Sequence, residues 1–166
     1  MPRSCALSEA SIEGEPATQI IFRQPSTNPE AEKELEILKR QDLVTGLLNR
    51  PAFLDELNKA TTAAMGGKVD QVVVYMEIDD YRKVLDQVGV GGADILLGDA
   101  AQELKGVLAA QDICARFADH TFTLILTGRT HEACIELAQQ IRKRFEERIF
   151  EVGKRSVSVT MSLGIC

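Results

Sequence analysis

The sequence predicts an α/β (α+β) domain in which helices pack across one central antiparallel sheet. Three observations predict this class. Residues 71–78 form a continuous apolar run rich in valine, residues 113–126 hold two apolar runs around a polar centre, and segments with helical spacing lie between and after them. From residue 71 onward the expected order is βααββαβ, in which the strands joined by hairpins pair antiparallel.

Length and composition indicate an acidic protein with one sizeable core. The chain has 166 residues, of which 45% are hydrophobic and 27% charged, and its net charge is −6. The absence of a basic run argues against nucleic acid and anionic membranes as partners, and no apolar run approaches the ~20 residues of a membrane span. The four cysteines are scattered without a CxxC pair, which favours a reducing cytoplasmic compartment over a disulfide framework.

Residues 1–27 are predicted to be an N-terminal leader rather than an independent domain. Residues 15–23 form one strand-like run, and a single strand cannot bury both of its faces. Two interpretations remain open. The run resembles the last strand of a PAS sensory domain, or the segment is a leader without a fold, disordered or added to the natural chain.

Residues 28–41 are predicted to form a linker helix. Asn28 is a favoured N-cap residue, proline suits the first turn, and Glu30 lies near the positive end of the helix dipole. Apolar residues spaced four and three apart then form a narrow stripe: Ala31, Leu35 and Leu38. Either the stripe pairs with a second copy in a short parallel coiled coil, or Leu35 and Leu38 pack on their own domain.

Residues 42–50 have the sequence DLVTGLLNR, which predicts a sharp turn in front of a helix. Gly46 permits the turn, and Asn49 and Arg50 carry groups that can bond loop carbonyls. Pro51 then opens the helix, which a glycine pair ends. We expect this motif to position the domain and to perform no chemistry.

The next segment is predicted to be a buried strand followed by two helices. Residues 71–78 lack polar alternation, as expected of a strand covered on both faces. A helix is expected over 81–88, a loop over 89–92, and a longer helix with Asp94 in its first turn up to about residue 108.

Two hairpins complete the predicted fold. The first turns at Asp119-His120, two residue types that tolerate positive φ. Thr130 then caps a helix that reaches about residue 146. The second hairpin turns at 153–155, and its second strand is expected to run without interruption over 156–165 with one buried face.

In this order, these motifs resemble the GGDEF domain of the diguanylate cyclase family. The N-terminal motif of the family matches at Asp42, Thr45, Gly46, Leu47, Asn49 and Arg50. The five signature letters fall on Ala118-Asp119-His120-Thr121-Phe122, of which only the closing phenylalanine is kept. The resemblance covers residues 42–166 and implies the ferredoxin-like arrangement of a nucleotide cyclase or polymerase palm.

The resemblance also implies that the chain is a fragment of a longer protein. The family carries about one further helix and strand, so residues 42–166 are expected to be a C-terminally truncated domain with an exposed apolar strip on its sheet. With a PAS-like strand in front, the arrangement is similar to PAS–GGDEF–EAL proteins of cyclic di-GMP signalling. The expected partners are therefore a second copy of the chain and a downstream EAL-type domain.

The family makes cyclic di-GMP from two GTP molecules, and the resemblance implies where its metal ions would bind. Mg²⁺ prefers oxygen ligands, which the family supplies from a carboxylate, the next backbone carbonyl and two hairpin acids; these positions are Glu77, Ile78, His120 and Thr121. Imidazole and hydroxyl groups are poor Mg²⁺ ligands, and Asp119 adds a negative charge where a triphosphate would approach. The metal site is thus expected to be degenerate, and a simple ion pair is the alternative role for Glu77.

The nucleotide and product sites are expected to be incomplete as well. The guanine-reading positions of the family correspond to Leu85 and Asp94, of which only Asp94 can hydrogen-bond. The phosphate-contacting positions correspond to Arg82 and Arg116, and the inhibitory site keeps Asp112 without its arginine. Structural alternatives stay open, namely a helix cap for Asp94 and a solvated charge for Arg82.

Together these observations predict a catalytically silent GGDEF domain that acts as a regulatory, dimerisation or signal-transmitting module. No cofactor is expected, and Mg²⁺ only if a nucleotide binds. Three alternatives are an active diguanylate cyclase that holds Mn²⁺ with Glu77, Asp79 and His120, a GTP-binding sensor without turnover, and an interaction scaffold built on the stripe of residues 31–38.

Overall fold

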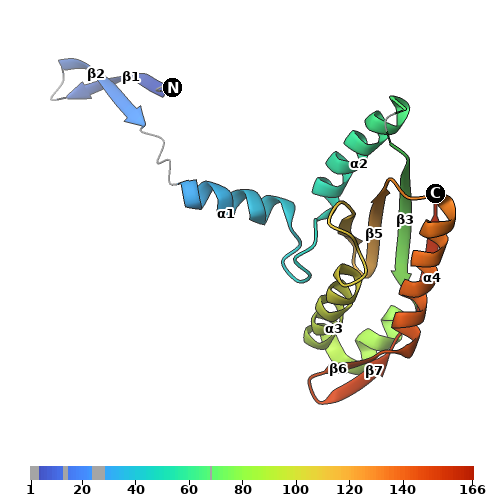
Figure 1. Cartoon of the computed structure of the whole chain (residues 1–166). Coiled ribbons are helices and arrows are strands. Elements are labelled where there is room, and N and C mark those ends of the chain that lie inside the picture. The colour runs from blue at the N-terminus through green and yellow to red at the C-terminus, as the bar shows by residue number, and fades with distance from the viewer. Residues whose placement is uncertain (1–3, 13–14, 24–28, 68) are drawn as a thin grey trace. The chain divides into compact units, whose positions relative to one another are not determined.

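The computed structural model describes residues 4–12, 15–23, 29–67 and 69–166, with side chains from residue 33 onward in these ranges. The chain divides into two compact units, residues 1–36 and 37–166, and each is described by itself. Figure 1 shows the helices and strands in chain order. Within the described ranges, no helix combines the length and the apolar character that crossing a membrane requires.

The first unit contains an antiparallel pair of strands. β1 (Ser4–Ile12) pairs with β2 (Glu15–Arg23) over its whole length. The strand predicted over 15–23 is therefore present, but the expectation that it stands alone is wrong. The sequence of β1 mixes small and polar residues and has little β-branched character, so its strand propensity is weak. The assignment of this segment to a PAS domain stays a prediction.

The helix predicted ahead of the domain is present as α1 (Pro29–Arg40). Leu35 and Leu38 are 52% and 54% exposed, and the neighbouring Ile37 is 52% exposed. Leu38 therefore does not pack into the core of residues 37–166. The side chain of Ala31, the first member of the stripe, lies outside the described residues.

The second unit is built on a four-stranded antiparallel sheet. The strands are β3 (Gln71–Ile78), β4 (Ile113–Ala118), β5 (Thr121–Thr127) and β8 (Met161–Ile165), and their spatial order is β4-β5-β3-β8. Because β3 is central, its residues pair on both sides, and Glu77 lies opposite Thr121 of β5 and Ser162 of β8. The predicted α+β class with an antiparallel sheet is confirmed.

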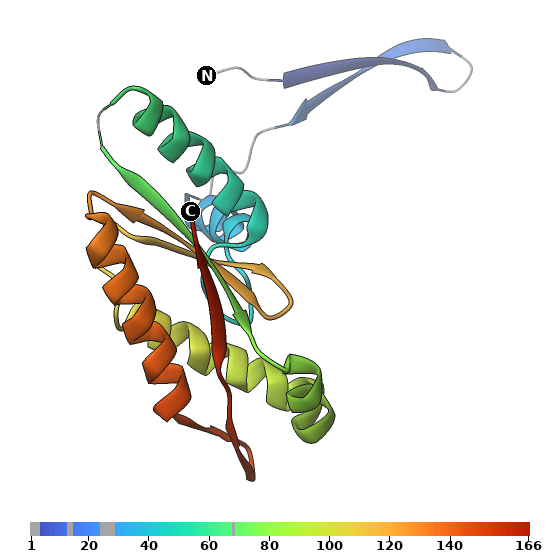
Figure 2. The ribbon, with the colours of Figure 1, turned by 90° about the vertical axis from the view of Figure 1, so that its right-hand side faces the viewer.

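Helices cover both faces of this sheet (Figure 2). On one face, α2 (Arg50–Met65) places Phe53 against Ala115 and Ile125. On the other face, α3 (Tyr81–Lys105) and α4 (His131–Glu147) bury a larger cluster. Its fully buried members include Met76, Ile78, Leu96, Leu97, Leu104, Phe122, Leu124 and Phe145. The covered faces explain why β3 and β5 have almost no polar alternation.

The predicted loop at 89–92 is wrong, because only Gly89 leaves helical geometry. Gly89 has φ 71° and ψ 177°, and α3 continues on both sides of this kink. Gly92 lies inside the helix, and close packing at this position explains why the residue is a glycine. A Cβ at this position would lie 2.7 Å from Cβ of Val88 and 2.9 Å from Cγ1 of Val152. Glycine here therefore indicates close packing, not a turn.

The uninterrupted strand predicted over 156–165 is also wrong. The segment divides into β7 (Arg155–Ser158), which pairs with β6 (Ile149–Val152), and β8, which pairs with β3. Val157, Val159 and Met161 are all buried, so the alternation of buried residues continues through the break. Alternation reports which face is buried and does not report a change of partner strand.

Candidate functional site

The predicted metal positions meet at the carboxyl end of β3. The β4–β5 hairpin tip lies on one side because β5 begins opposite Glu77. The segment before β8 lies on the other side because β8 begins opposite Ile78. The antiparallel register thus brings three distant parts of the sequence to the point where β3 ends and α3 begins.

The carboxylate of Glu77 is bound by the imidazole of His120. His120 Nε2 lies 2.9 Å from Glu77 Oε1, and the carboxylate can only accept, so the hydrogen is on Nε2. The ring of Tyr81 stacks on the imidazole at a centroid distance of 4.7 Å and an angle of 8°. His120 Nδ1 is buried and has no hydrogen-bond partner in the described part of the chain. The ion-pair alternative for Glu77 is the geometry that the structure contains.

The carboxylate of Asp79 is fully engaged by hydroxyl groups from β8 and the residues before it. Thr160 Oγ1 donates to Asp79 Oδ2 at 2.6 Å, and Ser162 Oγ donates to Oδ1 at 2.7 Å. These two hydrogen bonds, Thr160 first, hold the pKa of Asp79 below its ordinary value. Sequence reasoning missed both donors, although their i, i+2 spacing places them on one face of a strand.

The remaining predicted metal positions offer little to a cation. At Ile78 only the backbone carbonyl could contact a cation, because its side chain is apolar and buried; its backbone N–H donates to the carbonyl of His120 at 3.2 Å. The side chain of Thr121 is also buried. Mg²⁺ prefers several oxygen ligands in octahedral geometry. Among the described residues, however, no three His, Cys, Asp or Glu side chains lie close enough together to hold a metal ion. The residues present therefore do not fit the metal site of the family, nor the Mn²⁺ site of Glu77, Asp79 and His120.

Arg116, a predicted phosphate contact, is bound within the protein. Its guanidinium contacts Asp42 at 3.2 Å and donates to the carbonyl of Asp119 at 2.7 Å. Burial raises the pKa of Asp42, but hydrogen bonds from Thr45 and the charge of Arg116 outweigh burial and leave that pKa lowered. Arg116 thus ties the turn after α1 to the hairpin tip.

The predicted nucleotide positions lie on α3, with Arg82 and Leu85 in its first turns and Asp94 after the kink at Gly89. Arg82 and Asp94 are exposed, Leu85 is half-buried, and neither charged residue forms an ion pair with another described residue. Burial raises the pKa of Tyr81, and the negative charges of Asp94 and Asp119 add to this effect. The hydrophobic side chain of Leu85 offers no hydrogen bond to a base, so Asp94 is the position of this pair that can still accept one.

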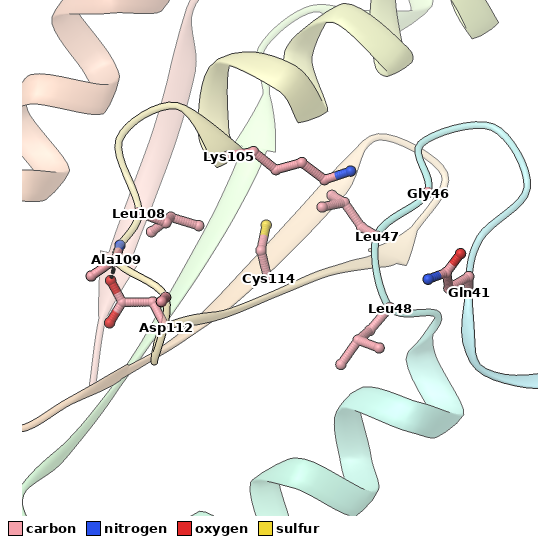
Figure 3. Close-up of a pocket in the computed structure, with 10 residues that line it drawn as sticks. Gln41, Gly46, Leu47, Leu48, Lys105, Leu108, Ala109, Asp112 and Cys114 are labelled. Carbon is pink, nitrogen blue, oxygen red and sulfur yellow. Dashed lines mark hydrogen bonds between the residues drawn. The ribbon is translucent and has the colours of Figure 1, made fainter. Parts of the chain in front are cut away.

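The predicted inhibitory site adjoins a cavity of about 540 Å³ (Figure 3). Asp112 is fully buried there, and its Oδ2 accepts from the Ala109 amide at 2.9 Å and from Arg129. Lys105 lines the cavity and lies 3.5 Å from the carbonyl of Thr45. Asp112 is therefore engaged in local structure, and sequence reasoning missed Arg129 as its partner.

Cys114 supplies the thiol in this cavity, and Figure 3 shows its sulfur pointing toward Leu47 and Lys105. Burial raises the pKa of this thiol to about 12, so it stays protonated at neutral pH. No arginine lines the described part of the cavity, and bidentate recognition of a phosphate is therefore not available in it.

Comparison with known proteins assigns this architecture. Residues 39–166 match the family model "Diguanylate cyclase, GGDEF domain". The crystal structure of the FimX GGDEF domain from Pseudomonas aeruginosa is 32% identical, with a TM-score of 0.73, over 76% of this chain and 78% of that chain. The coiled coil and GGDEF domain of DgcB from Caulobacter crescentus, solved with c-di-GMP, has a TM-score of 0.78 at 23% identity over 82% and 73% of the two chains.

Two curated relatives are much longer proteins. Cyclic di-GMP phosphodiesterase PdeR of Escherichia coli is 33% identical over 81% of this chain. The bifunctional diguanylate cyclase/cyclic di-GMP phosphodiesterase MucR of Pseudomonas aeruginosa is 29% identical over 81% of this chain. The chain spans about 20% of the length of either relative.

Proposed function

The chain belongs to the GGDEF family of diguanylate cyclase domains, and from this premise we propose that its domain is catalytically silent. It acts as a regulatory, dimerisation or signal-transmitting module in cyclic di-GMP signalling. The observation that carries the proposal is the hydrogen bond between Glu77 and His120. In the family, the position of His120 holds an acid that helps the strand carboxylate to bind metal ions. A protein donor, the imidazole of His120, faces the carboxylate at the end of β3.

The size of the expected loss supports silence over slow turnover. Losing one preorganised charge-stabilising group typically costs roughly 10²–10³ in rate, and both hairpin acids are replaced, by His120 and Thr121. Asp119 adds a negative charge near the position of a triphosphate. Two unit charges ~4 Å apart repel by about 4 kcal/mol at an effective dielectric constant near 20.

A direct assay tests this proposal. The purified chain at high concentration is incubated with GTP and either Mg²⁺ or Mn²⁺, and cyclic di-GMP is quantified by chromatography. An active diguanylate cyclase serves as the control for the assay. We expect no product above the blank, and steady accumulation of cyclic di-GMP would contradict the proposal.

The proposed partners are a second copy of the chain through α1 and a downstream EAL-type domain of a longer cytoplasmic protein. More than half of the surface of Leu35 and Leu38 is exposed, as expected of an unpaired coiled-coil stripe. MucR is a bifunctional diguanylate cyclase/cyclic di-GMP phosphodiesterase and PdeR a cyclic di-GMP phosphodiesterase, which supports the second partner. Light scattering tests dimerisation, and Leu35→Glu with Leu38→Glu is expected to yield monomers.

A GTP sensor without turnover is the second candidate, favoured by the exposed carboxylate of Asp94, which can still accept a hydrogen bond from guanine. Under this alternative, millimolar GTP raises the melting temperature, and Asp94→Ala removes the shift. Asp86→Ala is the matched control, because Asp86 is an exposed acid on the same helix. Absence of a shift at millimolar GTP would eliminate this candidate.

A further inference from the structure

Residues 77–79, at the carboxyl end of β3, form hydrogen bonds with the hairpin on one side and with Thr160 and Ser162 on the other. Toward the hairpin, the amide of Ile78 donates to the carbonyl of His120 at 3.2 Å, and His120 Nε2 donates to Glu77 at 2.9 Å. In both bonds the same hairpin residue is the partner, once through its backbone and once through its side chain. Both the backbone and the side chain of His120 therefore hold the hairpin tip against the end of β3.

The attachment on the other side has the same form. The amide of Asp79 donates to the carbonyl of Thr160 at 3.0 Å, and the hydroxyl of Thr160 donates back to Asp79 at 2.6 Å. Ser162 adds a third bond at 2.7 Å. Hydroxyl groups this close to a carboxylate form charge-assisted hydrogen bonds, which are stronger than bonds between neutral groups.

We infer that this end of β3 is a metal-free clasp, in which protein donors take the carboxylate oxygens that a cation would need. The clasp consists of Glu77, Ile78, Asp79, His120, Thr160 and Ser162. This inference deepens the proposed function, because it identifies what holds the hairpin tip in a domain without a metal ion.

Two features of the geometry make the clasp self-sufficient. Both oxygens of Asp79 already accept a hydrogen bond, so a cation at this carboxylate would have to share each oxygen with Thr160 or Ser162. The imidazole of His120 is held by the parallel ring of Tyr81 at 4.7 Å, which keeps Nε2 aimed at Glu77. With the hairpin acids replaced by His120 and Thr121, the family positions that keep a good oxygen ligand for Mg²⁺ are Glu77 and the backbone carbonyl of Ile78, and these two do not make an octahedral site.

The clasp assigns a positioning role to Thr160, Ser162 and His120, and hydrogen exchange of the full chain tests this role. In EDTA, His120→Ala is expected to speed exchange of the Ile78 amide by roughly tenfold, and Thr160→Val with Ser162→Ala to speed exchange of the Asp79 amide by a similar factor. Millimolar Mn²⁺ is expected to leave the exchange of the wild-type amides unchanged.

Matched variants separate the clasp from general loss of structure. Ser156→Ala removes a hydroxyl that donates to the carboxylate of Glu151 on the β6–β7 hairpin, so neither clasp amide should respond. Thr160→Ser keeps the hydroxyl and should retain wild-type protection of Asp79. His120→Gln keeps an N–H donor and should recover part of the protection of Ile78. Equal responses of the Asp79 amide to Thr160→Ser and Thr160→Val would overturn the clasp.

Binding of Mn²⁺ alone, followed by electron paramagnetic resonance, completes the test. The wild-type chain is expected to leave the free Mn²⁺ signal unchanged at submillimolar metal. Stoichiometric binding that Glu77→Gln abolishes would overturn the clasp, and without product formation it would leave the proposed silence standing. Formation of cyclic di-GMP with unchanged exchange of the clasp amides would overturn the silence and not the clasp.

Discussion

The turn over 42–49 and the hairpin tip over 118–121, which Arg116 joins, differ in what they keep of the family pattern. The turn over 42–49 matches the family motif, and its polar groups are bound within the fold, with Asp42 accepting from Thr45 and Arg116. The tip over 118–121 has lost the acids of the family, and its side chains bind protein groups in their place. Contacts that position the domain can thus persist where the groups for catalysis have been exchanged.

The largest effect is expected when the turn is detached from the tip. Arg116→Ala leaves Asp42 without its charge partner and the Asp119 carbonyl without two donors. The side chains of Arg116 and Asp42 are mostly shielded from solvent, at 16% and 22% exposure. Breaking their ion pair should therefore cost more than breaking a surface pair, and we expect a loss of about 2–3 kcal/mol in unfolding free energy. Urea unfolding measures the loss.

Arg142→Ala is the control for this prediction. It breaks an exposed i,i+4 pair with Glu146 and is expected to cost about 0.5 kcal/mol or less. Equal losses for the two variants would show that the turn is not tied to the tip more strongly than any surface pair.

The attachment of the turn to α2 should matter somewhat less. Asn49 caps α2 by accepting from the Ala52 amide at 3.0 Å and donates to the carbonyl of Lys39 at 2.7 Å. Asn49→Ala is therefore expected to cost about 1–2 kcal/mol. Thr130→Ala removes only the cap of α4 and should cost less by thermal or urea unfolding. A smaller loss for Asn49→Ala than for Thr130→Ala would show that the bond to Lys39 adds nothing.

The contrast between turn and tip also marks what the sequence alone can predict. The strand at 71–78, the hairpin at 113–127 and the cap at Thr130 follow local patterns, so they were predictable. The bond from Thr160 to Asp79 joins residues 81 positions apart, and it depends on the register of β8 against β3. Nothing in the local sequence reports that register.

Two further features of the structure depend on contacts between residues distant in the sequence. Val90–Gly92 lie within α3, although a run rich in glycine indicates a loop, because packing against Val152 requires the missing side chain at Gly92. Asp112 was predicted for an inhibitory site, whereas Arg129 reaches it from the loop after β5. Tertiary contacts decided both positions, and spacing along the chain does not encode such contacts.

Replacing His120 by an acid is expected to have a moderate effect on stability and tests the comparison between turn and tip. His120→Glu places a second carboxylate against Glu77 and removes the donor, which should cost about 1 kcal/mol at this partly exposed site. Added Mn²⁺ is expected to recover part of the lost melting temperature, because a second carboxylate offers oxygen ligands. His131→Glu, at the exposed start of α4, should not respond to Mn²⁺. An equal Mn²⁺ response of both variants would contradict the assignment of the tip.

The smallest effect is the pH dependence of the turn. The folded protein holds the pKa of Asp42 below its ordinary 3.8, so the stabilisation is fully present above that value and is lost as the pH falls through the lowered pKa. The difference in melting temperature between wild type and Asp42→Asn should stay constant from pH 7 to about pH 5 and shrink in more acidic buffer. If this difference in melting temperature became larger on acidification, the folded protein would stabilise Asp42 in its protonated form.

The position of β8 at the border of the described sheet has a practical consequence. A border strand presents peptide donors and acceptors that can recruit another strand, and such edges promote aggregation unless they are covered or charged. We therefore expect intermolecular β-pairing through this edge in concentrated samples of the chain. Oligomers formed in this way would survive substitutions on α1, and charged residues on the outer edge of β8 should dissolve them.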